Sequence, residues 1–72
     1  MRMCDLEPGQ SALVARNYSK GSMRRRFLDI GLIENTCVEC VSKSPLGDPA
    51  AYLIRGAVIA IRHDDCCDII LE

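Results

Sequence analysis

Short apolar runs separated by turn-forming residues make up most of the chain. Five of these runs are typical of strands, because each holds alternating or β-branched apolar residues between segments rich in Gly, Pro, Asn and Asp. They are Ser11–Arg16, Thr36–Lys43, Ala51–Arg55, Ala57–Arg62 and Asp68–Glu72. In the second run the alternation points Val38, Cys40 and Ser42 to one face, with Val38 and Cys40 inward. Gly56 separates the third run from the fourth, as in a hairpin. The pattern therefore predicts a mainly β fold.

One segment has helical periodicity instead of alternation. Met23, Phe27 and Ile30 recur at positions i, i+4 and i+7, which places them on one side of a helix. We expect Ser22 to cap the first turn of this helix, because its hydroxyl can accept a backbone N–H bond. Gly31 follows the last apolar position, where a residue with a left-handed backbone commonly ends a helix. The sequence therefore predicts one short helix from about residue 22 to residue 30.

The remaining segments complete a small barrel. The segment His63–Cys67 has room for one helical turn, which we expect Asp64 to cap. Five short strands, one short α-helix and no internal repeat predict a closed or partly open β-barrel, in which closure protects the strand edges. The expected core residues are Val38, Ile54, Ile59, Ile61, Ile69 and Leu71.

Size and composition favour a binding module over an enzyme. The chain has 72 residues, 49% apolar and 26% charged, as expected of a single globular domain over residues 1–72. So small a fold has little room to enclose both a large substrate and a catalytic constellation. The sequence has no P-loop and no Gly-x-Ser-x-Gly motif, and its one histidine, His63, lies in an expected surface turn. We therefore expect no enzymatic activity.

The sequence has neither a membrane-spanning segment nor a secretory signal. Its apolar runs are far shorter than the roughly 20 residues needed to cross a bilayer. Residues 1–10 carry Asp5 and Glu7 where a signal peptide would have an apolar region. A cytoplasmic location without membrane insertion is the resulting expectation.

Charge is divided unevenly along the chain, although the net charge is only −1. Residues 1–26 hold six basic and two acidic residues, whereas residues 27–72 hold three basic and eight acidic ones. Three consecutive arginines on the expected helix span about 200° of its circumference, so most of them face solvent or a partner. Arginine is favoured at interfaces because its planar donors pair with carboxylates, and the turn-rich loop after the second strand is a second exposed candidate. The predicted partner-binding residues are Arg24, Arg25, Arg26, Pro45, Leu46 and Asp48.

Five cysteines, an odd number, cannot all pair with one another, and thiols are expected in a reducing compartment. Cys37-Val-Glu-Cys40 has the spacing of half a zinc site. On a strand, however, residues three apart face opposite ways about 10 Å apart, so we expect these two thiols not to share an ion. His63 has helical i+3 and i+4 spacing to Cys66 and Cys67, which suits a soft metal if further ligands complete the site. His63, Cys66 and Cys67 are therefore the candidate metal ligands, with simple packing as the alternative, and the fold is expected to require no cofactor.

Several motifs in order resemble the ferrous-iron transport protein A (FeoA) family over nearly the whole chain. They are Leu6-x-Pro-Gly-Gln, Arg26-Phe-Leu-Asp-Ile-Gly-Leu32, Ser44-Pro-Leu-Gly-Asp-Pro49, Ile54-Arg-Gly56, Ile59-Ala-Ile-Arg62 and a closing acidic turn before Ile69-Ile-Leu. Asn35 stands where the family has glycine, so Asn35 must supply any left-handed turn there. Cys66 stands where alanine is expected, which is consistent with a small buried residue. The resemblance implies an SH3-like β-barrel of about five strands with one short α-helix.

The resemblance also implies a function. Members of the family work in the cytoplasm with FeoB, the membrane ferrous-iron transporter, which carries a GTP-binding domain. We therefore predict a non-enzymatic accessory protein that binds the cytoplasmic domain of FeoB. A small carrier or sensor that binds transition metal weakly through Cys and His is the alternative. A nucleic-acid-binding barrel is the third hypothesis, and an aromatic content of 4% disfavours it because stacking platforms are scarce. Weak self-association stays open.

Overall fold

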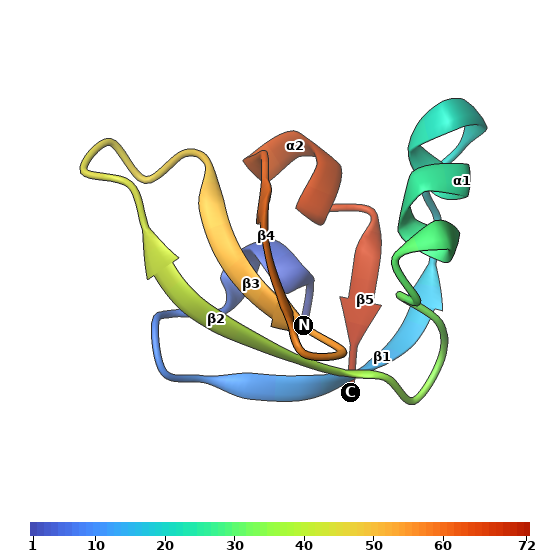
Figure 1. Cartoon of the computed structure of the whole chain (residues 1–72), viewed down its shortest axis with the longest axis horizontal. Coiled ribbons are helices and arrows are strands. Elements are labelled where there is room, and N and C mark those ends of the chain that lie inside the picture. The colour runs from blue at the N-terminus through green and yellow to red at the C-terminus, as the bar shows by residue number, and fades with distance from the viewer.

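The computed structural model describes all 72 residues and consists mainly of a strongly curved antiparallel sheet (Figure 1). The strands are β1 (Ser11–Asn17), β2 (Cys37–Lys43), β3 (Ala50–Ile54), β4 (Ala57–Ile61) and β5 (Ile69–Leu71). A 3₁₀ helix, η1 (Met3–Asp5), the helix α1 (Gly21–Asp29) and the single-turn helix α2 (His63–Cys66) complete the fold. Every predicted strand is present within one residue of its expected bounds, so the mainly β prediction is confirmed.

Strand β1 is where the sheet turns a corner. The spatial order is β4-β3-β2-β1-β5, and the first half of β1 pairs with β2 while its second half pairs with β5. A register shift between Val14 and Arg16 marks the change of partner, and such irregularities bend a strand and increase its twist. The sheet therefore curls on itself, with β4 and β5 as its two edges, which corresponds to a partly open barrel.

The concave side of the sheet holds one apolar core of 15 residues. Five of the six predicted core residues are buried, and the sixth, Ile59, is half-buried against the cluster. The prediction missed the contribution of the N-terminal segment, because Met3 and Leu6 are fully buried beneath the barrel. Tyr52 is also buried and directs its hydroxyl toward the Met3 carbonyl oxygen at 3.5 Å. Packing of η1 against the open side of the sheet thus supplies apolar area that strand periodicity does not reveal.

Helix α1 docks through the predicted apolar side but begins differently than expected. Phe27 is buried, and Met23 and Ile30 pack against the core. The N-cap is Lys20, whose backbone is extended, and it makes no side-chain capping bond. Ser22 therefore lies inside the first turn, and the prediction that it caps the helix is wrong because the helix begins one residue earlier, at Gly21.

The turn after α1 has the left-handed residues that the sequence predicted. Gly31 has a φ of +86°, and a Cβ there would overlap the side chain of Arg55. The Arg55 Nε and Thr36 Oγ1 atoms both donate hydrogen bonds to the Gly31 carbonyl oxygen, each at 3.1 Å. Asn35 has a φ of +69°, as its place in the turn required. Position 31 therefore favours glycine for two reasons: its backbone is left-handed, and the Arg55 side chain occupies the space that a Cβ would need.

Two smaller expectations are corrected by tertiary contacts. A register shift between Cys40 and Ser42 interrupts the alternation of β2, so Ser42 is exposed and does not share the inward face of Val38 and Cys40.

Helix α2 is preceded by Arg62 as its N-cap, and Asp64 lies within the first turn. Asp48, from the loop between β2 and β3, accepts the His63 backbone N–H at 2.9 Å through Oδ1. A distant carboxylate thus satisfies the helix start that we assigned to Asp64.

Candidate functional site

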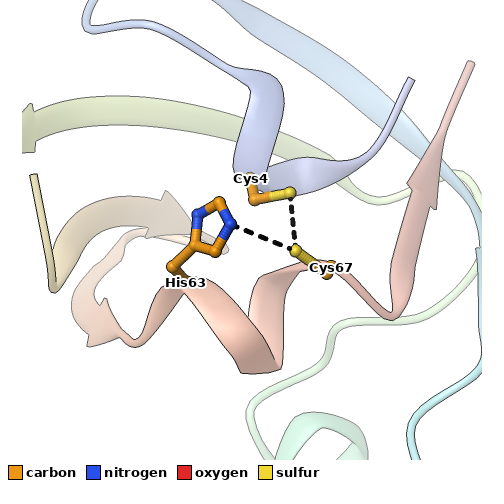
Figure 2. Close-up of side chains that lie close together, drawn as sticks. All are labelled: Cys4, His63 and Cys67. Carbon is orange, nitrogen blue, oxygen red and sulfur yellow. Dashed lines mark hydrogen bonds between the residues drawn. The ribbon is translucent and has the colours of Figure 1, made fainter.

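A group of three metal-ligating side chains lies where η1 meets α2 (Figure 2). Cys4 comes from η1, His63 begins α2 and Cys67 follows its last residue. The Cys4 and Cys67 Sγ atoms are 3.0 Å apart, and the Cys67 Sγ atom is 3.5 Å from His63 Nε2. All three potential ligand atoms lie within 4.8 Å of one another. The fold therefore brings two thiols and an imidazole together around one point.

The local sequence explains the position of His63 and Cys67. Residues i and i+4 of a helix lie on the same side, so one turn of α2 is enough to face both side chains toward η1. Cys66, one position earlier, is rotated by about 100° and enters the core. Its Sγ atom lies 4.0 Å from the Ile61 carbonyl oxygen, and the residue is fully buried. The one-turn helix thus separates two adjacent cysteines into one core residue and one site residue.

Backbone hydrogen bonds at the N-terminal segment fix the position of Cys4. The Arg2 backbone N–H donates to Asp5 Oδ2 at 3.0 Å, which closes the turn of η1. The Leu71 N–H of β5 donates to the Met1 carbonyl oxygen at 2.6 Å, and Arg2 forms an isolated bridge with Ile70. Strand β5 therefore holds η1 against α2.

Burial raises the pKa of three of the thiols, Cys4, Cys40 and Cys66, and the shift is largest for Cys4 and Cys66. Burial raises the pKa of Cys4 to about 11, and the hydrogen bond with Cys67 adds to this shift. Burial also raises the pKa of Cys66, to about 12. Both thiols are therefore protonated at neutral pH in the metal-free protein, which makes them poor nucleophiles.

The structure brings together two of the three candidate metal ligands and adds one that we missed. His63 and Cys67 belong to the group, whereas Cys66 points into the core and its place is taken by Cys4. Cys4 lies 63 residues from Cys67 along the chain, and no spacing rule connects them. The signal that the sequence offers is the group of apolar residues Met3, Cys4 and Leu6 near the N-terminus, which are residue types that a small fold tends to bury.

The three predicted arginines all lie exposed on α1 but in different surroundings. Arg24 Nη1 donates a hydrogen bond to the Asn17 carbonyl oxygen at 2.9 Å, which ties it to the end of β1. Arg26 lines a groove of about 320 Å³ beside α1. Arg25 has neither contact. Of the three predicted arginines, Arg26 is therefore the one that borders this groove.

That groove, called here the α1–β4 groove, joins elements that the sequence suggested separately. It is lined by Met23, Arg26, Phe27, Ile30, Pro49, Ile59, Ala60, Ile61, Arg62 and Asp65. Pro49 belongs to the same loop as Pro45, Leu46 and Asp48. The helix and this loop therefore border one continuous surface, with apolar walls and charged groups of both signs at its edges.

The predicted loop residues differ in their roles. Leu46 is 95% exposed, the largest exposure of any large apolar side chain in the protein, and Pro45 is also exposed. Asp48, in contrast, is engaged with the start of α2 through the bond to His63. Leu46 is thus free for an intermolecular contact, while Asp48 has a structural role.

No helix in the structure is both long and apolar enough to span a membrane.

Comparison with known sequences identifies relatives of the whole chain. The family model described as the FeoA domain matches residues 1–72. A curated protein of Porphyromonas gingivalis, the Fe(2+) transport protein A/Fe(2+) transporter FeoB fusion protein, is 31% identical over 72 residues. The match covers 100% of this chain and only 8% of the fusion protein. The chain thus spans less than a tenth of that relative's length.

Solved structures share the fold. The FeoA protein from Chlorobium tepidum has a TM-score of 0.92 at 27% identity, covering 99% of this chain and 68% of that one. Iron(II) transport protein A from Clostridium thermocellum has a TM-score of 0.93 at 28% identity, covering 100% of this chain and 44% of that one. FeoA from Stenotrophomonas maltophilia, solved in complex with zinc and described as an SH3 domain protein, has a TM-score of 0.88 at 21% identity and covers 100% of this chain and 89% of that one. The SH3-like fold that the motifs implied is confirmed.

Proposed function

This chain belongs to the FeoA family, and from that premise we propose that it is a non-enzymatic, cytoplasmic accessory protein of bacterial ferrous-iron transport that binds the cytoplasmic domain of the transporter FeoB. The observation that carries the proposal is the Porphyromonas gingivalis fusion, in which a segment similar to this entire chain is joined to FeoB. Covalent linkage holds two parts at high effective concentration and favours contact between them. Such a contact requires a surface of this domain that is complementary to FeoB.

The α1–β4 groove supports the proposal as the contact surface. Its walls are apolar, and Arg26, Arg62 and Asp65 add charges at its edges. Apolar area with a few charged groups at the rim is the usual composition of a protein interface. Leu46 extends from the neighbouring loop with 95% of its surface exposed, which offers an apolar anchor for a shallow pocket on a partner.

The proposal is tested by titrating the isotope-labelled chain with the purified cytoplasmic domain of FeoB, with and without guanine nucleotide, while following backbone amide shifts. We expect the largest shifts in α1, in residues 45–49 and in β4. Arg26→Gln should weaken binding about 5- to 30-fold, the effect of losing one or two kcal/mol at an interface.

Arg16→Gln is the matched control, because it removes the same charge from a second groove on the other side of α1. Binding should be unchanged in this variant. The proposed surface is wrong if Arg16→Gln weakens binding more than Arg26→Gln or if the shifts concentrate around β1. The proposed function is wrong if no binding occurs at millimolar concentration in any nucleotide state.

A further inference from the structure

We propose that Cys4, His63 and Cys67 form a binding site for a borderline-soft divalent transition ion, with Zn²⁺ as the representative ligand. A bound ion displaces the thiol protons of Cys4 and Cys67 to solvent, and the resulting two thiolates and one imidazole form a ligand set that favours Zn²⁺ and Co²⁺ over Mg²⁺ and Ca²⁺, which prefer oxygen. No carboxylate belongs to the group. The site is independent of the surface proposed for FeoB binding, because none of the three residues lines the α1–β4 groove.

The spacing of the ligand atoms fits one tetrahedral ion. With zinc bonds of about 2.3 Å to sulfur and about 2.0 Å to nitrogen, the ligand atoms around the ion are roughly 3.5 to 3.8 Å apart. The His63 Nε2 to Cys67 Sγ distance is 3.5 Å, which already agrees. The two sulfur atoms, 3.0 Å apart, must separate by less than about 1 Å. Side-chain rotation of Cys67, which is only half-buried, provides that movement.

Accessibility gives the ion a path to the site. Cys4 is buried, Cys67 is half-buried and His63 is exposed, so an ion can reach the group from the side of His63. Three protein ligands leave the fourth tetrahedral position to water or to a small solute. Closed four-ligand sites are structural, whereas an open position permits exchange. The site is therefore suited to reversible loading.

The reduced state of both cysteines is a condition for binding. A disulfide between Cys4 and Cys67 would bring the sulfur atoms to about 2.05 Å and remove both as ligands. All five cysteines are free thiols in this structure. The binding experiment therefore uses a phosphine reductant, which does not compete as a thiol ligand.

The test is a titration of the full chain with Co²⁺, followed by displacement with Zn²⁺. We expect one Co²⁺ per chain, with sulfur-to-cobalt charge-transfer absorption and the intense visible bands of tetrahedral coordination, both abolished by Zn²⁺. His63→Ala changes an exposed residue and should leave the fold intact while weakening binding by more than the roughly 10- to 100-fold that loss of an outer-shell partner costs. Cys67→Ser should remove at least about half of the charge-transfer intensity, because one of the two sulfur ligands is then absent.

Cys37→Ser is the matched control, since Cys37 is exposed on β2 and outside the group. It should bind Co²⁺ as the native chain does. Absence of charge-transfer absorption in the native chain overturns the proposal, and so does its loss in Cys37→Ser. A ratio of one ion to two chains also overturns it, because the ligands would then come from separate molecules. If Cys4→Ser fails to fold, His63→Ala and Cys67→Ser still decide the question.

Discussion

Two cysteine pairs in this protein differ in how their separation along the sequence relates to their distance in the structure. Cys37 and Cys40 are separated by two residues, yet Cys37 is exposed and Cys40 is fully buried on the other face of β2. Cys4 and Cys67 are 63 residues apart, yet their sulfur atoms lie 3.0 Å from each other. The familiar zinc spacing thus belongs to the pair that cannot bind one ion, as its placement on a strand predicted.

The difference shows that a spacing motif has meaning only on a particular backbone. Three residues along a strand reverse the direction of the side chain, whereas four residues along a helix restore it. His63 and Cys67 meet because α2 is helical, and Cys4 joins them because β5 binds the N-terminal segment. The group of Cys4, His63 and Cys67 is therefore brought together by the helical backbone of α2 and by the pairing of β5 with the N-terminal segment.

The largest expected effect that tests this comparison is in thiol labelling. Cys37 should react with a thiol reagent at the rate of an exposed cysteine, while Cys40 and Cys66 should react at least about a thousandfold more slowly, since they require opening of the core. Pulse labelling with peptide mass spectrometry measures each site. Labelling in denaturant is the control, in which all five rates should converge. Equal rates for Cys37 and Cys40 in the native protein would contradict their assignment to opposite faces.

Alkaline pH should destabilise the fold through the buried thiols. Above pH 9 the thiols of the unfolded chain lose their protons, whereas burial raises the pKa of Cys4 to about 11 and that of Cys66 to about 12 in the native state. The native state then binds more protons, so the free energy of unfolding falls as pH rises from about 9 to 12, by at most about 1.4 kcal/mol per pH unit for each group.

Urea unfolding at a series of pH values measures this dependence. Cys66→Ala should flatten it, because one of the three buried thiols with a raised pKa is then absent. Cys37→Ala should leave the slope as in the native chain. A slope that persists in full after both Cys4 and Cys66 are replaced by alanine would mean that other groups cause the alkaline transition.

A smaller effect is expected on stability, where serine substitution of Cys40 should differ from serine substitution of Cys37. Cys40→Ser places a hydroxyl in the core, where its sulfur atom had only a weak contact of 3.9 Å with the Ser42 carbonyl oxygen. We expect a loss of about 1 to 3 kcal/mol in the free energy of unfolding. Cys37→Ser, on the exposed face, should change stability by no more than about 0.5 kcal/mol. Chemical denaturation of both variants makes the comparison, and equal losses would refute the inward position of Cys40.

The smallest expected effect is that of a chelator on the metal-free fold. The 15-residue core includes residues from every strand, and Cys4 is its only member that belongs to the proposed metal site. EDTA should therefore leave the melting temperature unchanged in protein prepared without metal, while added Zn²⁺ should raise it in proportion to the logarithm of its concentration. Loss of cooperative melting in EDTA would show that the Cys4, His63 and Cys67 group is structural rather than exchangeable.

The strands were predictable because apolar alternation directly records which residues face the core. Val38 and Cys40 on β2 illustrate this, and Gly31 and Asn35 marked their turns because few residues accept a positive φ. The helix starts were not predictable in the same way. The carboxylate of Asp48 satisfies the start of α2, and that partner comes from a loop about 15 residues upstream.

The metal-ligating group was predictable only in part. Helical spacing in a short acidic turn indicated His63 and Cys67, but it also indicated Cys66, because i+3 and i+4 positions are both near neighbours on an ideal helix. Burial of Cys66 follows from the contact of α2 with the core, which depends on the completed barrel. Cys4 could not be identified without the pairing of Arg2 with Ile70, a contact between opposite ends of the sequence.

The pairing of β5 with β1 has a consequence for the order in which the protein matures. Strands β2, β3 and β4 follow one another as a meander and can form as soon as they leave the ribosome, because their contacts are local. The second half of β1 must wait for residues 69–71, which are synthesised long after β1, and the docking of η1 must wait for the same strand. The thiols of Cys4 and Cys67 therefore meet only after translation has passed both of them and the final strand has docked. The proposed metal site of Cys4, His63 and Cys67 is therefore completed only when the domain has folded.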